Sequence, residues 1–264
     1  MPVSLLIVLS LVWCYNNFTL KTTQETISCA KAEGEIKIAV MSDLHSYSFG
    51  RDNLKIIEAT RELSPDLIFF LGDIYSRGQT NKIRQAVSFL DALSKIADVY
   101  VVTGDHDTDE LYKAELKAAE NIRLLNYKKE DITINSNALS IYGIDNVYFS
   151  TSFDLNNEFD KPDENRINIL LSHIPSMEHY DDFGFDFIFC GDTHGGMIRL
   201  PLLDGLYFDG YLLPKLTYKG TLTDKGLFEF ENTSLFVTSG LGNYPFPLRF
   251  NNRPEICLIT IKGE

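Results

Sequence analysis

This chain of 264 residues has few basic residues. It contains 24 lysines and arginines but 37 aspartates and glutamates, which gives a formal net charge of -13. Such a surface repels polyanions and offers no basic patch to DNA or RNA, so we expect no nucleic-acid partner. Because an acidic surface is often only a solvated surface with no bound metal, the net charge by itself identifies no metal site.

The chain also lacks a C-x-x-C pair among its four cysteines. Cys190 and Cys257 lie inside apolar, strand-like runs, where a thiol behaves as a small buried hydrophobe. A disulfide between these two stays open, but a chain of this length does not need one to hold its core. There is no repeat or low-complexity segment, and the length suits one large α/β domain.

Long uncharged apolar runs are absent except at the start, where Pro2–Tyr15 contains no charged residue. The next five residues extend the run to nearly the roughly 20 that span a bilayer. A basic n-region and a small-residue cleavage site are both missing. We expect a membrane anchor or uncleaved signal-like helix over residues 1–20, with a cleaved signal or a buried N-terminal helix as alternatives.

The polar segment 21–34 is expected to be a linker or an edge strand, leading to a catalytic domain over residues 35–264. Within the domain, apolar runs alternate with helical periodicity. Strands are predicted over 35–41, 66–71, 98–103, 167–171, 185–189, 226–231, 234–238 and 256–261. Helices are predicted over 52–63, 82–96 and 109–119. Polar turns follow several strands, at the edge where α/β sheets bind ligands.

Four of the five histidines stand in such turns, and His179 stands apart. A single histidine after a strand is more often structural, but four together indicate a site. Asp43 and His45 lie two residues apart at a strand end, so an oxygen and a nitrogen ligand point the same way. The four histidines in turns are His45, His106, His173 and His194.

Two further turns supply carboxylates. Asp73 follows a buried run, where a bare carboxylate is costly unless a cation or hydrogen bonds compensate it, and it could bridge two metals. The turn of Asp105, His106 and Asp107 offers a ligand, an acid and a carboxylate that orients the acid. Together these turns predict a site that binds metal cations and includes a candidate acid.

Five motifs in this order resemble the calcineurin-like metallophosphoesterases: D-x-H at 43–45, G-D-x-x-x-R-G at 72–78, G-D-H-D at 104–107, S-H-x-P at 172–175 and G-D-T-H-G-G at 191–196. The stretch from Ser239 to Ile256 is similar to the end of the bacterial membrane-anchored branch of that family, typified by a cell-wall-associated phosphoesterase. The resemblance covers about 35–262. It implies an α/β fold, a four-layer α-β-β-α sandwich, here with an N-terminal apolar helix.

The resemblance also implies two divalent metal ions, which could be manganese, iron, magnesium or zinc. His106 would be the catalytic acid, Asp107 would orient its ring, and Arg77 would have a structural or substrate-orienting role. The ligands of the first metal would be Asp43, His45, Asp73 and His194. The ligands of the second metal would be Asp73, Asp105, His173 and Asp192.

Two positions depart from the family pattern, which has asparagine in place of Asp105 and histidine in place of Asp192. Four carboxylates would then cancel the charge of two divalent ions. We expect weaker attraction for phosphate anions, or hard ions such as manganese, magnesium or ferric iron in preference to zinc at the second position. The alternative is that the second position is empty or reworked.

The expected activity is hydrolysis of a phosphate monoester, diester or pyrophosphate by a bridging hydroxide on the dinuclear centre. The turns contain no serine or cysteine nucleophile motif, so no phosphoenzyme is required. The alternative is a non-catalytic relative that uses the fold as a scaffold or binding protein. We expect a lipid or cell-envelope phosphate as substrate, a membrane contact through residues 2–20, and a membrane-anchored protein with an extracytoplasmic catalytic domain.

Overall fold

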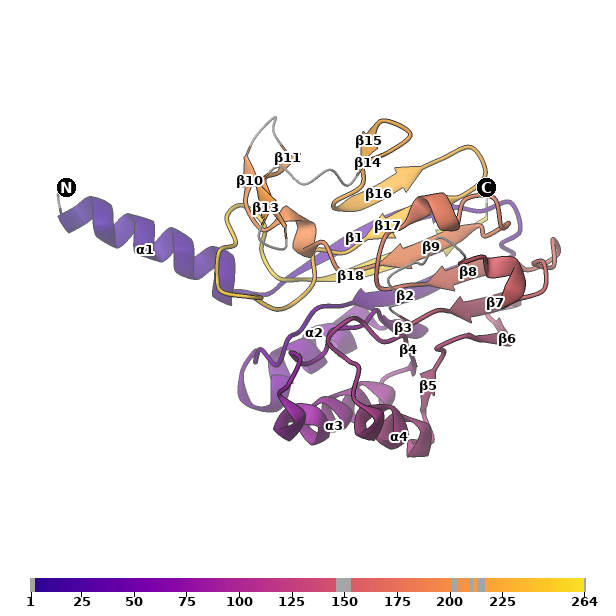
Figure 1. Ribbon diagram of the computed structural model, residues 1–264, viewed down its shortest axis with the longest axis horizontal. Helices are drawn as coiled ribbons and strands as arrows, with labels where there is room; N and C mark the ends of the chain where they lie inside the picture. The colour runs from indigo at the N-terminus through magenta and orange to yellow at the C-terminus, as the bar shows by residue number, and fades with distance from the viewer. Residues whose placement is uncertain (1–2, 146–152, 201–203, 209–210, 213–216, 264) are drawn as a thin grey trace.

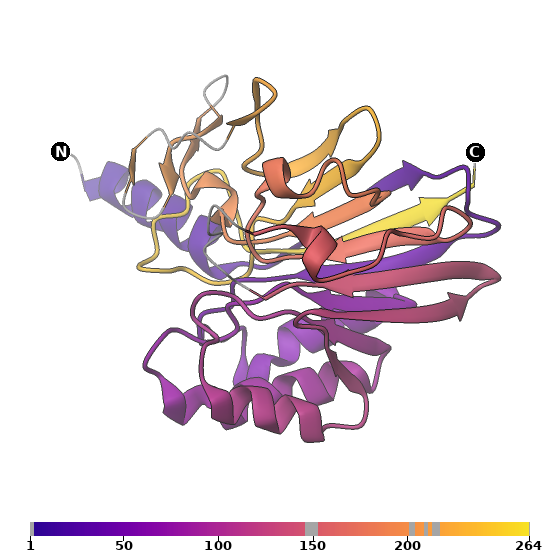
Figure 2. The ribbon, with the colours of Figure 1, turned by 45° about the vertical axis from the view of Figure 1, so that its right-hand side comes forward.

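Two six-stranded sheets pack face to face in the computed structural model, which describes residues 3–145, 153–200, 204–208, 211–212 and 217–263 (Figure 1). Buried side chains from both sheets, among them Phe69, Tyr100 and Phe189, fill the space between them. Three α-helices lie on the outer face of the first sheet, as Figure 2 also shows.

The first sheet has the order β1-β18-β2-β3-β4-β5. Strands β2 to β5 are parallel to one another, β18 is antiparallel to β2, and β1 is parallel to β18. The strands are β1 (Lys21–Ser28), β2 (Ile36–Met41), β3 (Leu67–Phe70), β4 (Asp98–Val101), β5 (Ile122–Leu124) and β18 (Glu255–Lys262).

The second sheet has the order β16-β17-β9-β8-β7-β6, parallel from β17 to β7 with an antiparallel strand at each edge. Its strands are β6 (Lys128–Ile134), β7 (Asn137–Gly143), β8 (Ile167–Leu171), β9 (Phe187–Cys190), β16 (Gly226–Glu229) and β17 (Ser234–Val237). Short hairpins pair β10 (Arg199–Leu200) with β11 (Asp204–Gly205), β12 (Tyr207–Phe208) with β13 (Tyr211–Leu212), and β14 (Thr217–Tyr218) with β15 (Thr221–Leu222).

Helices cover only one of the two outer faces in the described residues. The apolar stripes of α2 (Leu54–Leu63), α3 (Ile83–Ser94) and α4 (Glu110–Ala118) pack on the first sheet. On the second sheet a separate apolar cluster lies under loops and short 3₁₀ turns. The expected α-β-β-α order is therefore present, with short turns as its fourth layer. The 3₁₀ turns are η1 (Arg51–Asn53), η2 (Thr80–Lys82), η3 (Leu155–Asn157), η4 (Met177–His179) and η5 (His194–Gly196).

The segment 21–34 contains an edge strand. The chain over Lys21–Ser28 forms β1 and pairs along its whole length with β18, so the linker alternative is wrong there. The sequence pattern also missed β5, β6 and β7. Of these, β5 has only three residues, and β6 is a polar edge strand with little apolar alternation. The four cysteines are free, so Cys190 and Cys257 are buried thiols rather than a disulfide.

The N-terminal apolar run forms α1 (Val3–Phe18), which projects from the body of the protein (Figure 1). Its large apolar side chains are exposed on all sides, with Leu11 64% and Ile7 56% exposed. Pro2, where the run begins, lies outside the described residues. No helix in the described part of the chain has the length and apolar character needed to cross a bilayer, so the transmembrane helix predicted over residues 2–20 is not found there.

Candidate metal centre

Five loops meet at one edge of the sandwich. They follow β2, β3 and β4 in the first sheet and β8 and β9 in the second, and parallel strands bring their carboxyl ends to the same edge. Each loop bears at least one of the predicted site residues. The two sheets thus contribute to a single cluster, as the motif order predicted.

Three of the ligands predicted for the first metal face one another. The ligand atoms of Asp43, His45 and His194 lie within 4.8 Å of one another. The two imidazoles point their Nε2 atoms together at 3.2 Å, and their rings are stacked with centroids 5.0 Å apart. Nε2 of His194 is 3.9 Å from Asp43 Oδ1. This arrangement aims two nitrogens and an oxygen at a common point.

The residues predicted for the second metal form an adjoining group of Asp105, His173 and Asp192, again within 4.8 Å. Nε2 of His173 is 3.6 Å from Asp192 Oδ1 and 3.8 Å from Asp105 Oδ1. Asp73 lies between the two groups, with Oδ2 3.4 Å from His45 Nε2 and 3.5 Å from His173 Nε2. One carboxylate oxygen within reach of both groups is the geometry that a bridging ligand needs.

The donors themselves fit cations. His173 Nδ1 lies 2.7 Å from the carbonyl of Leu71, which places its proton on Nδ1 and leaves Nε2 as a lone pair. That Nε2 is buried, has no hydrogen-bond partner and faces carboxylates. A lone pair beside anions is unfavourable unless a proton or a cation lies between them. Carboxylate and imidazole together suit manganese, iron or zinc.

Burial shifts the ionisation of this cluster. It raises the pKa of Asp43 and of Asp192 to about 7 and lowers the pKa of His45 to about 3. Asp43 is fully buried, whereas the Asp192 side chain keeps 21% exposure, so water moderates the effect at Asp192. For Asp73, burial raises the pKa, but the positive charge of His173, once its Nε2 binds a proton, outweighs burial and the net shift is downward. Protons and cations therefore compete for the same oxygens.

His106 lies at the rim of the cluster. Its Nδ1 accepts a 2.8 Å hydrogen bond from the backbone N–H of Arg77, so the neutral ring has its proton on Nε2. The Arg77 guanidinium donates to the carbonyl of Asp105 at 2.6 Å and to its carboxylate at 3.2 Å. Arg77 thus orients both neighbouring site residues, in agreement with the structural role considered for it.

Asp107 does not orient His106, contrary to the prediction. Its fully buried carboxylate accepts hydrogen bonds from the backbone N–H groups of Asp73 (2.6 Å), Ile74 (3.2 Å) and Gly104 (3.2 Å). Adjacent side chains in this turn point in different directions. The Asp107 side chain therefore points into the core, whereas His106 faces the cluster. Asp107 fixes the position of the Asp73 turn instead.

Glycine is required where two of these turns touch. A Cβ at Gly104 would collide with the carboxylate of Asp73. Gly240, in the loop after β17, adopts φ +67°, and a Cβ there would lie 2.7 Å from Asp43 Cβ. Only glycine combines this backbone with such an approach. The loop after β17 is therefore part of the site.

This loop contains a residue that the sequence did not single out. The Tyr244 ring stacks on His45 with centroids 4.4 Å apart and meets His106 edge-on at 4.6 Å. The available signal was its place just after a glycine-containing turn that follows an apolar strand. The fifth histidine, His179, lies in η4 edge-on to Phe153 and is not part of the cluster.

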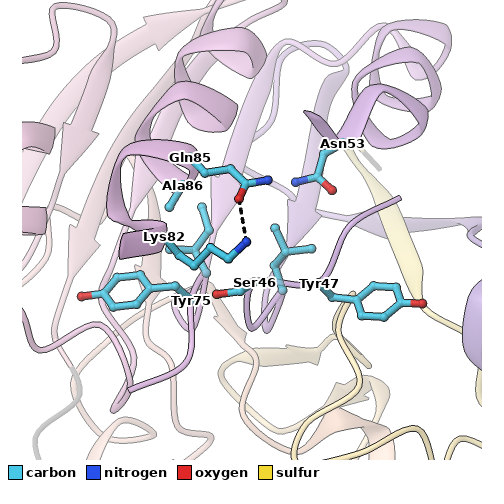
Figure 3. A pocket seen from close by; sticks show the side chains of 9 residues that line it. Ser46, Tyr47, Asn53, Tyr75, Lys82, Gln85 and Ala86 are labelled. Atoms are coloured by element: carbon cyan, nitrogen blue, oxygen red, sulfur yellow. Dashed lines mark hydrogen bonds between the residues drawn. The ribbon is translucent and has the colours of Figure 1, made fainter. Parts of the chain in front are cut away.

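A pocket lies beside the Asp43 and Asp73 turns, toward α3 (Figure 3). Leu44 and Ser46 line it from the first turn and Ile74 from the second. On the α3 side, Lys82 donates a 3.2 Å hydrogen bond to Gln85. Tyr47 also lines this pocket.

A family model described as calcineurin-like phosphoesterase matches residues 36–196. The chain belongs to this family. Membership in the calcineurin-like phosphoesterases makes it a metal-dependent hydrolase of phosphoric esters, and it confirms the predicted family.

Relatives within the family cover most of the chain. An uncharacterized metallophosphoesterase, YkuE of Bacillus subtilis, is 28% identical over 92% of this chain and 86% of its own. UDP-2,3-diacylglucosamine pyrophosphatase LpxG of Chlamydia muridarum is 24% identical over 87% of this chain and 84% of its own. Among solved structures, a 5'-nucleotidase precursor from Thermus thermophilus aligns with a TM-score of 0.47 and 12% identity, over 80% of this chain and 49% of that one.

Proposed function

We propose that the cluster binds two divalent cations and that the protein hydrolyses a phosphate ester or pyrophosphate directly with water. The observation behind this proposal is the position of Asp73 Oδ2, within 3.5 Å of imidazole nitrogens from both ligand groups. Bound cations would acidify a water molecule and neutralise charge on the phosphoryl oxygens. The ligands would be Asp43, His45, Asp73 and His194 for one cation and Asp73, Asp105, His173 and Asp192 for the other.

His106 is proposed as the acid. With Nδ1 accepting from Arg77, the Nε2 proton of the neutral ring is free for donation to a leaving-group oxygen. His106 also contacts His45 edge-on at 4.8 Å, so a phosphoryl group held at the cluster would lie within its reach. Asp107 supports this arrangement through the turn of Asp73 and not through the His106 ring.

The carboxylate-rich second group favours hard cations. Asp105 and Asp192 add two anionic oxygens around His173, so we propose manganese, magnesium or iron there in preference to zinc. Elemental analysis of protein purified with a mixture of these metals tests the preference. Two tightly bound zinc ions would contradict it.

For the substrate we propose a phosphate ester or pyrophosphate attached to a lipid. The name of the Chlamydia relative specifies a diacylated sugar nucleotide with a pyrophosphate, and that relative spans 87% of this chain. The exposed apolar helix α1 supports a protein held at a membrane surface, which we propose with the catalytic domain outside the cytoplasm. Fractionation of cells, followed by protease treatment of intact cells, tests this location.

The decisive experiment uses the full chain stripped of metal and resupplied with manganese, magnesium, iron or zinc. We expect hydrolysis of an aryl phosphodiester and of a diacylated sugar-nucleotide pyrophosphate in mixed micelles. The variant Asp73→Asn should lose cation binding and turnover together, because both ligand groups share that residue. Inactivity toward phosphate monoesters, diesters and pyrophosphates with every metal would overturn the proposal.

A further inference from the structure

The last turn of α1 is attached to the loop that follows β17. Asn17 is fully buried, and its side chain pairs with the backbone of Arg249: Nδ2 donates to the Arg249 carbonyl at 2.9 Å, and Oδ1 accepts from the Arg249 N–H at 2.8 Å. Asn243 donates to the Asn17 carbonyl at 2.8 Å. Because the buried side-chain amide of Asn17 has its hydrogen-bond partners in the loop after β17, these bonds fix the position of the loop relative to α1.

The same loop is bonded to the first metal-site turn. The buried Arg249 guanidinium donates to the carbonyls of Ser239 and Gly242, each at 2.7 Å. Gly242 in turn donates to the carbonyl of Asp43 at 2.6 Å. A continuous series of hydrogen bonds therefore joins the end of α1 to the backbone of a predicted ligand.

A second contact runs through aromatic rings. Phe18, the last residue of α1, stacks on Tyr47 at 6.2 Å, and Tyr47 is two residues beyond His45. On the other side of that turn, Tyr244 stacks on His45 at 15° between ring planes, and His45 stacks on His194 at 20°. The His45 imidazole is thus nearly parallel to two neighbouring rings, and both contacts restrict its plane.

We propose that Tyr244 is a positioning residue of the first cation site and that the last turn of α1 holds it in place. The Tyr244 ring keeps the His45 imidazole in the plane that aims Nε2 at Asp73 and His194. Tyr244 is only partly buried, so its packing on His45 is not explained by core filling. This inference rests on one part of the proposed function, the binding of a cation at His45.

The first test measures Mn²⁺ binding to the metal-free full chain by calorimetric titration and electron paramagnetic resonance, without substrate. Tyr244→Ala should weaken one of two cation sites roughly tenfold, as loss of a group that orients a ligand does, and leave the other unchanged. Tyr244→Phe keeps the ring and should bind as the wild type does. Unchanged affinity in Tyr244→Ala, equal weakening of both sites, or a phenylalanine variant as weak as alanine would each overturn the proposal.

The second test uses adjacent asparagines as a matched pair. Asn16 and Asn17 both donate to a carbonyl four residues earlier in α1, at 2.8 and 2.9 Å, but it is Asn17 that pairs with the Arg249 backbone. Asn17→Ala should weaken the site that Tyr244→Ala weakens, and Asn16→Ala should not. Equal cation affinity in the two variants would contradict the role of α1.

Asn243→Ala guards against a folding defect in Asn17→Ala, because it removes a different hydrogen bond between the same two segments, the one to the backbone carbonyl of Asn17, at a partly exposed position. It should weaken the same site by a smaller factor, with a circular dichroism spectrum like that of the wild type. Unchanged affinity in this folded variant would also count against the proposal. A chain that binds two cations with these effects but hydrolyses no phosphate ester would contradict the proposed function alone.

Discussion

Several candidate ligands hold a backbone conformation that is rare outside glycine. A non-glycine residue at positive φ costs on the order of 1–3 kcal/mol and persists where the surrounding fold enforces it. Such residues gather at functional sites, and here they coincide with the metal cluster. The φ angles are 53° at Asp43, 48° at His45, 55° at Asp73, 69° at Asp192 and 49° at His194.

The sequence predicted which residues meet but not how each one points. The motifs placed Asp43, Asp73 and His173 in loops at one edge, and the structure brings them together. The left-handed backbones of Asp43 and Asp73 have no signature in a D-x-H or G-D pattern. Asp107 was misassigned for the same reason, because adjacency to His106 in sequence does not specify the direction of a side chain in an irregular turn.

Replacing His106 by alanine should leave the cation content unchanged and lower turnover by a factor on the order of 10² to 10⁴. The ring is held by Arg77 at the rim, and the cluster keeps its other donors. Steady-state kinetics with elemental analysis of the same sample provides the measurement. Turnover equal to the wild type would exclude His106 as the acid.

Replacing Asp107 by alanine should lower the free energy of unfolding by about 3 kcal/mol or more, because three buried N–H groups lose their acceptor. Urea denaturation followed by circular dichroism measures the change. Asp107→Asn is the matched control: it keeps an oxygen for Asp73 and Gly104 and should lose less. Equal stability of the alanine variant and the wild type would show that water satisfies these groups.

At the scale of elements, local periodicity was sufficient for the α-helices of the domain. The predicted helices over 52–63, 82–96 and 109–119 correspond to α2, α3 and α4, because each has an apolar stripe on the adjacent sheet. The position of β1 in the sheet could not be predicted from local sequence, since its partner β18 is more than 200 residues away in the chain. Pairing over that separation leaves no pattern within a local window.

Glu255 joins these distant elements. It begins β18, and its buried carboxylate lies 3.0 Å from Lys21 of β1 and 3.2 Å from Lys225, while accepting a hydrogen bond from the Ser239 N–H. Burial raises the pKa of Glu255, but the two lysines outweigh it and the net pKa falls from 4.5 to about 2. The ionised form is therefore favoured by folding.

Because the folded pKa is depressed, the stabilisation from Glu255 is complete above about pH 4.5 and is lost as the pH falls from there through about 2. The loss is on the order of 2–3 kcal/mol. We expect the difference in unfolding free energy between wild type and Glu255→Gln to be largest above about pH 5 and to shrink toward about pH 2. A difference independent of pH over that range would exclude ionisation of Glu255 as the cause.

At the scale of the whole molecule, the cluster joins the two sheets. Asp43, Asp73 and Asp105 come from the first sheet, and His173 and Asp192 come from the second. Cations bound there would bridge the two halves of the sandwich and offset part of the net charge of -13. The fold class was predictable from motif order, whereas the thin fourth layer was not, since short 3₁₀ turns have no extended periodicity.

Removal of cations should therefore lower thermal stability. Two sites filled at about a hundred times their dissociation constants contribute about 5 kcal/mol in total, which corresponds to a change in Tm of about 10 °C or more for a protein of this size. Calorimetry with manganese and with a chelator measures the difference. Asp73→Asn should abolish most of it, and identical melting of the wild type in both conditions would argue against cation binding.

The position of β18 between β1 and β2 sets the order of assembly during translation. Residues 21–28 leave the ribosome well before residues 255–262, with which they pair. Until β18 has been synthesised, β1 has no partner in the sheet. A premature stop codon shortly before β18 would consequently leave β1 unpaired in addition to removing β18 itself.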